Sequence, residues 1–446
     1  MSKLNYRDFQ TDGQRSRNLQ AIIREKTFAP ETTKTLRTFS SWEVAELILK
    51  VHKKTLQKKL IDEPDMPRGS SEGSDSVNKP KRFTLEEINL IRRMWGSGDK
   101  RPLMPFRPNN KRAIRAAISN FKGGSGKSTC ALHFAHAAAL DGYKVLLVDF
   151  DPQATLSHAM GVYDTPEERT VWGIIARDLA RQAEVLAYER KLADRKDEIK
   201  VPDTVTALGL DTYTADRFIQ PTCWPTIDII ASCANAAFVE FASGEYRMAI
   251  PEWSFFGCMD RFLDSLPHDQ WDIIIFDNPP AIGYQALNAV FAADVLYIPF
   301  GPAYWEYDST TSFVNQLGDA LEELSKGFAR SVEVKSKLPK EFLAAKYMLT
   351  RFDANNPLHQ AMLECVQMAF RDRVAKNHIE ATRAVEQSGR HLQSIYEIDY
   401  REMTRETWRR ARRSFDAAYE EFIETIRGVW HELPDIESRD NETRAA

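Results

Sequence analysis

The sequence predicts an α/β fold, in which a mostly parallel sheet carries helices on both faces and a small helical domain precedes it. Three apolar segments support this prediction: residues 113–118, 144–149 and 271–277. The pattern of each segment predicts a buried strand, and glycines or carboxylates follow each one. Because ligands of open α/β sheets bind at the carboxyl ends of the strands, these polar residues are expected to share one edge.

The first strand leads into a loop with the sequence Phe-Lys-Gly-Gly-Ser-Gly-Lys-Ser-Thr, and a helical pattern follows it over residues 130–140. Strand, glycine-rich turn and helix form the context of a phosphate-binding loop, whose backbone N–H groups turn inward and whose helix adds a partial positive charge. Lys127 can reach the β- and γ-phosphates, and the Ser128 hydroxyl can ligate Mg²⁺. The predicted nucleotide-binding residues are Lys122, Gly123, Gly124, Ser125, Gly126, Lys127, Ser128 and Thr129.

Two further strands end in carboxylates. Residues 144–153 deliver Asp149, Asp151 and Gln153 to the edge that carries the loop, and residues 271–280 deliver Asp277. Asp277 is expected to lie near Mg²⁺. For Asp149 the sequence leaves two interpretations open. It lies near the metal and its waters, or it ends its strand as a helix cap.

The loop lacks the first glycine of G-x-x-x-x-G-K-[ST] and has Lys122 beside that position. It resembles the deviant Walker A motif, K-G-G-x-G-K-[ST], of the ParA/MinD family of P-loop ATPases. The segments around Asp151 and Asp277 resemble that family's D-x-D-P-Q and D-x-P-P motifs. The resemblance covers residues 113–430 and implies hydrolysis of ATP to ADP and phosphate, with Mg²⁺ as cofactor.

Residue roles follow from the same resemblance. Lys122, Lys127 and Asp151 are the implied catalytic residues, with Asp151 orienting the attacking water and Lys122 reaching the nucleotide of a partner copy in a homodimer. The implied metal site comprises Ser128, Asp149 and Asp277.

The expected domain organisation has five parts. A helix within residues 1–35 either mediates dimerisation or docks on a neighbouring domain. Residues 36–95 contain two capping boxes and a short basic helix, an order that resembles the winged, MerR-like helix-turn-helix domain of long plasmid ParA proteins. Residues 96–112 are a proline-rich linker, 113–430 the ATPase domain and 431–446 an acidic, frayed tail.

Two groups of residues are candidates for DNA contact, and for each the alternative is an ordinary solvated surface. The basic helix would bind a specific operator, with its lysines on phosphates and Thr55 or Gln57 on base edges. The ATPase domain would bind DNA nonspecifically. The candidates are Lys53, Lys54, Thr55, Gln57, Lys58 and Lys59 in the helix, and Lys376, Arg383 and Arg390 in the ATPase domain.

The charge distribution and the cysteine content indicate what kind of partner the protein binds and in which compartment it works. Residues 1–115 contain 25 Lys and Arg against 14 Asp and Glu, whereas the whole chain of 446 residues has a net charge of −4. A basic N-terminal part ahead of an acidic body suggests a polyanion-binding module. Five scattered cysteines, no signal peptide and no apolar run of membrane-spanning length predict a soluble, cytoplasmic protein. The sequence has neither a G-x-S-x-G nor an H-E-x-x-H motif, so serine-nucleophile and zinc-hydrolase chemistry has no support.

The resemblance implies a DNA-segregation ATPase that is nucleoid-associated, is stimulated by a ParB-like centromere-binding partner and represses its own operon. One alternative is a transcription factor that uses ATP only as a conformational switch. Another is a MinD-like membrane ATPase, which would need a basic amphipathic C-terminal helix. The acidic residues at 435–442 argue against that version.

Overall fold

The computed structural model describes residues 10–16, 19, 22, 34–71, 81–96, 103–192, 199–206, 208, 209, 214–327, 337–385 and 392–436. The chain divides into two compact units, Met1–Arg37 and Thr38–Ala446. In the first unit, the described residues 10–16, 19 and 22 are helical, and Leu19 and Ile22 are exposed. The other residues of the helix predicted there lie outside the described residues.

The second unit begins with a small module of short elements. Its three-stranded antiparallel sheet has the order β1-β3-β2. Both predicted capping boxes are present, because Ser40 and Glu43 exchange hydrogen bonds, as do Thr84 and Glu87. The elements are β1 (Phe39–Ser40), η1 (Glu43–Ile48), α2 (Lys53–Asp62), β2 (Ser70–Ser71), β3 (Lys81–Phe83) and α3 (Leu85–Gly96).

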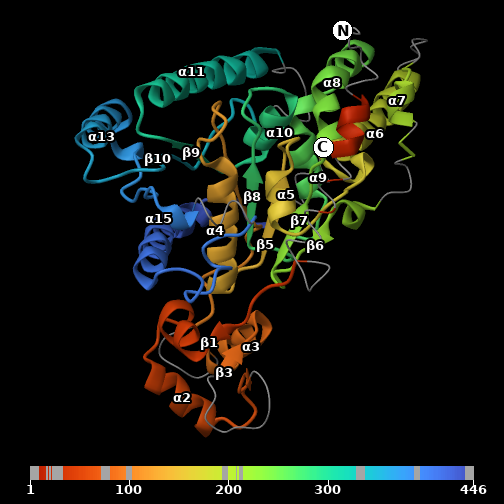
Figure 1. Ribbon diagram of the computed structural model, residues 1–446. Helices are drawn as coiled ribbons and strands as arrows, with labels where there is room; N and C mark the ends of the chain where they lie inside the picture. The colour runs from red at the N-terminus through yellow and green to blue at the C-terminus, as the bar shows by residue number, and fades with distance from the viewer. Residues whose placement is uncertain are drawn as a thin grey trace. The chain divides into compact units, whose positions relative to one another are not determined.

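The larger part of this unit is built on a seven-stranded sheet of order β10-β9-β4-β8-β5-β7-β6 (Figure 1). All neighbouring strands are parallel except β6, which pairs antiparallel with β7. The mostly parallel sheet predicted from the sequence is therefore confirmed. The strands are β4 (Ile114–Ile118), β5 (Val145–Asp149), β6 (Gln220–Pro221), β7 (Ile227–Ile230), β8 (Ile273–Asp277), β9 (Val295–Phe300) and β10 (Ala344–Leu349).

Helices alternate with these strands. The α-helices are α4 (Lys127–Asp141), α5 (Thr155–Ala159), α6 (Val171–Leu192), α7 (Asp203–Thr206), α8 (Phe238–Ala249), α9 (Cys258–Asp264), α10 (Tyr284–Ala292), α11 (Tyr304–Gly327), α13 (Pro357–Phe370) and α15 (Arg405–Trp430). Short 3₁₀ turns are η2 (Glu167–Arg169), η4 (Ala215–Phe218), η5 (Ala234–Ala237), η6 (Phe255–Gly257) and η7 (Arg371–Arg373).

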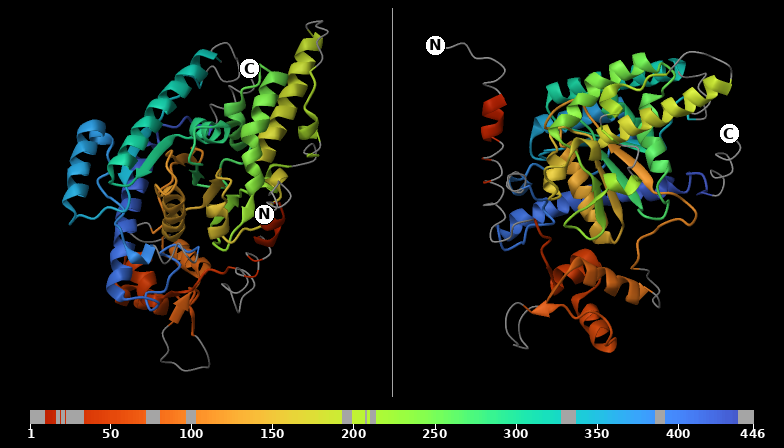
Figure 2. Two further views of the ribbon diagram at one scale, coloured as in Figure 1. Left: turned by 45° about the horizontal axis from the view of Figure 1, so that its top comes forward. Right: turned by 90° about the vertical axis from the view of Figure 1, so that its right-hand side faces the viewer.

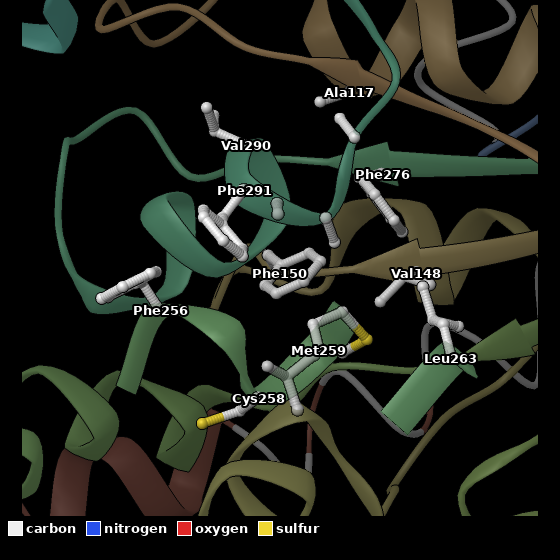
Figure 3. Close-up of a cluster of buried hydrophobic side chains, with 14 of the residues drawn as sticks. Ala117, Val148, Phe150, Phe256, Cys258, Met259, Leu263, Phe276, Val290 and Phe291 are labelled. Atoms are coloured by element: carbon white, nitrogen blue, oxygen red, sulfur yellow. The ribbon is translucent and has the colours of Figure 1, made fainter. Parts of the chain in front are cut away.

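Helices cover both faces of the sheet, as the two views of Figure 2 show. On one face, Phe134 of α4 stacks on Phe422 of α15 at 4.7 Å, and Tyr297 of β9 meets the same ring at 5.2 Å. On the other face, the predicted strands and helices α6, α9 and α10 share one apolar core. Figure 3 shows Phe150 in this core beside Met259 and Phe291.

The aromatic residues after β7 divide between the core and the surface. Tyr246, Trp253, Phe255 and Phe256 are buried, whereas Phe238 and Phe241 are exposed. They lie on the outer side of α8, whose inner side carries Val239, Ser243 and Tyr246. An aromatic composition alone does not say which side of a helix faces the core.

The described parts of the linker and of the tail contact the ATPase domain. Arg107 in the linker pairs with Asp272 at 2.9 Å, and the Phe106 carbonyl accepts a hydrogen bond from Tyr143. At the start of the tail, Leu433 is buried and the Ile436 amide donates to the Asn110 carbonyl at 3.0 Å. The described parts of both segments are thus held against the ATPase domain, whereas residues 437–446 lie outside the described residues.

Candidate functional site

The predicted phosphate loop connects β4 to α4 at the carboxyl edge of the sheet. Gly124 and Gly126 have φ values of +77° and +98°, a region that residues with a Cβ rarely adopt. Gly126 is the N-cap of α4 and has no side chain to occupy the amides of the first helical turn. These free amides and the helix N-terminus are suited to an anionic ligand.

The outer side of the loop is attached to the end of β10. The Thr350 hydroxyl donates to the Ser125 carbonyl at 2.9 Å, and the Arg351 guanidinium donates to the Gly124 carbonyl. A Cβ on Gly126 would lie only 3.2 Å from the Thr350 methyl. Since two successive carbonyls point toward β10, the loop conformation is held from outside and its amides remain available inside.

The two loop lysines have different surroundings. Lys127 is buried, and its ammonium donates to the Lys122 carbonyl at 3.2 Å. Burial lowers the pKa of Lys127, while Asp277 and Asp151 oppose this shift. Lys122 is partly exposed, and its ammonium lies 3.5 Å from a carboxylate oxygen of Glu306 and 5.7 Å from the Trp305 ring centroid.

Asp149 is fully buried, and both its oxygens already accept hydrogen bonds. One accepts from the Asp151 amide at 3.0 Å, and the other from the Ser157 amide at 2.9 Å and the Ser157 hydroxyl at 2.6 Å. Burial raises the pKa of Asp149 to about 7. This geometry supports the second of the two readings left open by the sequence, in which Asp149 caps the backbone after its strand.

Asp151 lies in the turn that Asp149 supports. Its carboxylate accepts from the Gln153 amide at 2.9 Å, and its carbonyl accepts from the Ala154 amide at 2.8 Å. Ala154 has a φ of +53° and begins α5, so the chain reverses sharply here. Asp151 is only partly buried, unlike the other two carboxylates.

Asp277 lies between the loop and Asp149, because β8 pairs Asp277 with Ile118 of β4 and with Asp149 of β5. It is fully buried, and neither carboxylate oxygen has a hydrogen-bonding partner among the described residues. Burial and the neighbouring Asp149 raise the pKa of Asp277 well above its usual range, while Ser128 and Lys127 oppose this shift.

An unpartnered buried carboxylate beside a cation and a hydroxyl fits a site that receives another positive charge. Within the described ranges, no group of three or more His, Cys, Asp and Glu side chains is arranged to hold a metal ion. Ser128 and Asp277 could hold Mg²⁺ there, with phosphate and water oxygens completing its coordination.

The structure brings the loop, Asp149, Asp151 and Asp277 together, but places the predicted DNA-contact residues elsewhere. On α2, Leu56 is buried and anchors the helix, whereas Lys53, Lys54, Thr55, Gln57 and Lys58 are exposed. Lys59 is half-buried, 3.4 Å from Glu63 and 5.9 Å from the Trp95 ring centroid. Lys59 therefore already has contacts within its own module.

In the ATPase domain, Lys376 and Arg383 are exposed, and Arg390 lies outside the described residues. Lys376 follows η7, where its amide donates to Glu421 of α15 at 2.9 Å. The two side chains are accessible from solvent, but nothing in their contacts distinguishes a DNA surface from a solvated one.

Three further residues surround the loop, none of which is among the site residues predicted above. Thr350, Arg351 and Glu306 contact the loop or one another, although they are more than 170 positions away along the chain. Thr350 and Arg351 follow the mostly apolar residues 344–349, and the segment of Glu306 follows the apolar residues 295–300, so their place at the sheet edge was available as a signal. The sequence does not single out Glu306 itself, because a single glutamate in the first turn of a helix is common.

The fold and the site place this chain in the class of P-loop nucleotide-binding proteins. Comparison with known proteins identifies the family within that class. A family model described as "AAA domain" matches residues 113–329. The chain is 30% identical over 419 residues to "Putative replication protein A" of Sinorhizobium fredii, which covers 92% of this chain and 91% of that protein. It is 27% identical to SopA of Escherichia coli K12, over 88% of this chain and 89% of SopA.

Among solved structures, a partition protein superposes with a TM-score of 0.57 at 16% identity, over 94% of this chain and 99% of that chain. That likeness agrees with the fold described above. On the sequence similarity, the chain belongs to the ParA-type family of partition ATPases. In the described part of the chain, no helix has both the length and the apolar character that crossing a bilayer would require.

Proposed function

We propose that this protein is an ATP-driven DNA-partition ATPase, which binds ATP and Mg²⁺ at the candidate site and hydrolyses ATP to ADP and phosphate. The observation that carries the proposal is the convergence of one loop and two carboxylates at a single sheet edge, with Lys127, Asp151 and Asp277 from three different strand ends. The two lysines of the loop, together with the backbone amides of the loop and of the first turn of α4, suit a triphosphate.

Each residue has a distinct role in the proposed reaction. The loop amides and Lys127 bind the triphosphate and stabilise the charge that develops on it. Asp151, the most accessible of the three carboxylates, orients water for in-line attack on the γ-phosphorus. Mg²⁺, held through Ser128 and by way of Asp277, would neutralise phosphate charge. Asp149 keeps the Asp151 turn in place through its hydrogen bonds with the Asp151 amide and with Ser157.

Lys122 gives the proposal its second feature, assembly of a homodimer that depends on nucleotide. A partly exposed lysine at the rim of the loop can reach a nucleotide bound to a second copy. ATP then favours the dimer because it gains contacts there that the monomer lacks.

The dimer would bind DNA nonspecifically, with Lys376, Arg383 and Arg390 as candidate contacts. The N-terminal module would bind an operator through the exposed face of α2, which makes the protein a repressor of its own operon. A ParB-like, centromere-bound partner would stimulate hydrolysis and release the dimer, and the protein would be cytoplasmic and associated with the nucleoid.

A second candidate function is a transcription factor that uses ATP only as a switch. The exposed basic residues of α2, on a module separate from the ATP site, favour it. It requires operator binding that responds to nucleotide but no turnover.

ATP hydrolysis by the wild type, Lys122→Ala and Asp151→Ala separates these functions. Each protein is assayed alone, with nonspecific duplex DNA, and with DNA plus the protein encoded next to it. We expect slow wild-type turnover that rises with DNA and the neighbour and is lost at least a hundredfold in Asp151→Ala, as for removal of a group that acts in the transition state.

Binding of a fluorescent ATP analogue is the control, because Asp151→Ala should still bind nucleotide. Wild-type binding without turnover under any condition would exclude the partition ATPase and favour the switch. An Asp151→Ala variant that hydrolyses normally would remove Asp151 from the mechanism.

A further inference from the structure

Glu306 connects three segments at the rim of the phosphate loop. It lies in the first turn of α11, and its side chain is only about a tenth exposed. One carboxylate oxygen accepts from the Gly301 amide at 2.5 Å, and both lie 2.6 Å from the Arg351 guanidinium. A Cβ on Gly301 would lie 2.4 Å from this carboxylate, so the backbone approaches it closely.

The same carboxylate is the nearest acidic partner of Lys122 among the described residues, at 3.5 Å. Glu306 therefore contacts two cations, Lys122 and Arg351, and the two contacts differ in length. Arg351 makes short contacts of 2.6 Å to both carboxylate oxygens, whereas the Lys122 contact is longer, at 3.5 Å to one oxygen. Both side chains reach solvent, Lys122 with 32% and Arg351 with 49% of its surface exposed, so contact length and number distinguish them. The Lys122 ammonium is the one that can leave at low cost.

Departure of Lys122 would leave no buried charge unpaired. Glu306 would retain Arg351 and the Gly301 amide, and Arg351 would retain Glu306 and the Gly124 carbonyl. Buried charges are costly only when their partner is lost altogether. The loop would also keep its outer attachments, since these involve Thr350 and Arg351 and not Lys122.

We propose that Glu306 is a positioning residue that competes with the triphosphate for Lys122, and so sets the ATP concentration at which the dimer forms. Phosphate oxygens and the Glu306 carboxylate are anions that require the same ammonium. Any free energy of the Lys122–Glu306 contact must be given up when Lys122 turns to phosphate, which weakens ATP-dependent assembly by that amount. This inference rests on the proposed function.

The test is Glu306→Gln, which removes the charge but leaves an oxygen to accept hydrogen bonds. Fluorescent ATP-analogue titration and sedimentation velocity are run against ATP concentration with Mg²⁺. We expect the midpoint of dimer formation to move to an ATP concentration about three- to tenfold lower, the size expected for a partly exposed ion pair. Asp308→Asn is the matched control, an exposed carboxylate two positions along the same helix, and should leave the midpoint unchanged.

Whether Glu306 acts through Lys122 is tested in a Lys122→Gln background, at a protein concentration raised until the dimer is again detected, because this variant lacks the contact that favours the dimer. If Glu306 acts through Lys122, the Glu306→Gln shift disappears there, because the cycle isolates the pairwise contribution. A shift of equal size in both backgrounds would overturn the proposal and leave Glu306 as a structural support for Arg351. An unchanged or raised midpoint in folded Glu306→Gln, judged by its thermal unfolding, would also overturn it while leaving the proposed function intact. Failure of the wild type to bind the analogue at all would overturn both.

Discussion

At the scale of single residues, the helix that carries the phosphate loop is held by a buried neutral histidine. His133 on α4 contacts the Thr129 carbonyl through Nδ1 at 2.7 Å and accepts from the Ile395 amide through Nε2 at 3.2 Å. Its ring stacks on Phe415 at 3.7 Å. Burial lowers the pKa of His133 to about 3. The contacts join the first turn of α4 to the segment before α15.

This histidine predicts acid sensitivity of the fold. The folded pKa is depressed below the unfolded value of 6.5, so the unfolded chain binds the extra proton between these values and stability falls as pH decreases below 6.5. From pH 7 to pH 5 we expect His133 to account for a loss of about 2 kcal/mol. Urea denaturation across this range should show a smaller decrease for His133→Gln, whose amide can keep both contacts without titrating. If the free energy of unfolding falls as much with pH in His133→Gln as in the wild type, other groups cause the acid sensitivity.

At the scale of elements, the end of β10 decides the shape of a loop far away in sequence. Thr350 follows the last residue of that strand, and its hydroxyl reaches the Ser125 carbonyl because β10 and the loop share one sheet edge. Thr350 is almost fully buried, so loss of the hydroxyl would leave that carbonyl without its partner.

Thr350→Val tests this link. We expect the Kd for ATP to rise about tenfold, the equivalent of one buried hydrogen bond, with a small effect on the unfolding temperature. Thr350→Ser keeps the hydroxyl and should bind ATP nearly as the wild type does. If the serine variant is impaired and the valine variant is not, the methyl contact with Gly126 matters and the hydrogen bond does not.

At the scale of the whole second unit, the opposite end of α4 meets the N-terminal module. Arg92 of α3 is buried and donates to the Leu140 carbonyl in the last turn of α4 at 2.5 Å. Arg82 of β3 pairs with Asp399 at 3.1 Å. Gly142, with a φ of +97°, ends α4 where a Cβ would lie 2.9 Å from the Arg92 guanidinium. One helix thus touches both the loop and the module.

Because these contacts join module and ATPase domain, we expect the wild-type second unit to unfold in one calorimetric transition. Arg92→Ala removes a buried hydrogen bond from a charged donor and should lower stability by about 2–3 kcal/mol, with the module unfolding at a lower temperature as a separate transition. Its exposed neighbour provides the control, since Arg93→Ala should keep the single transition. A single transition in Arg92→Ala would show that the other contacts suffice.

The strands, the loop and the three carboxylates were predictable from the sequence alone, because these signals are local. An apolar run ending in Asp identifies Asp149 and Asp277, and the spacing of glycines and lysines identifies Lys122 to Thr129. The capping boxes at Ser40 and Thr84 are equally local. Parallel strands then require these groups to meet at one edge, and the family resemblance added their roles.

The surroundings of these residues depend on how the helices and strands pack together. Asp149 turned out to be engaged by Ser157, Lys122 by Glu306 and the loop carbonyls by Thr350 and Arg351. The exposure of Phe238 likewise depends on which side of α8 meets the sheet. Hydrogen bonds and burial between residues tens to hundreds of positions apart arise from the packing of whole elements, and no local pattern encodes them.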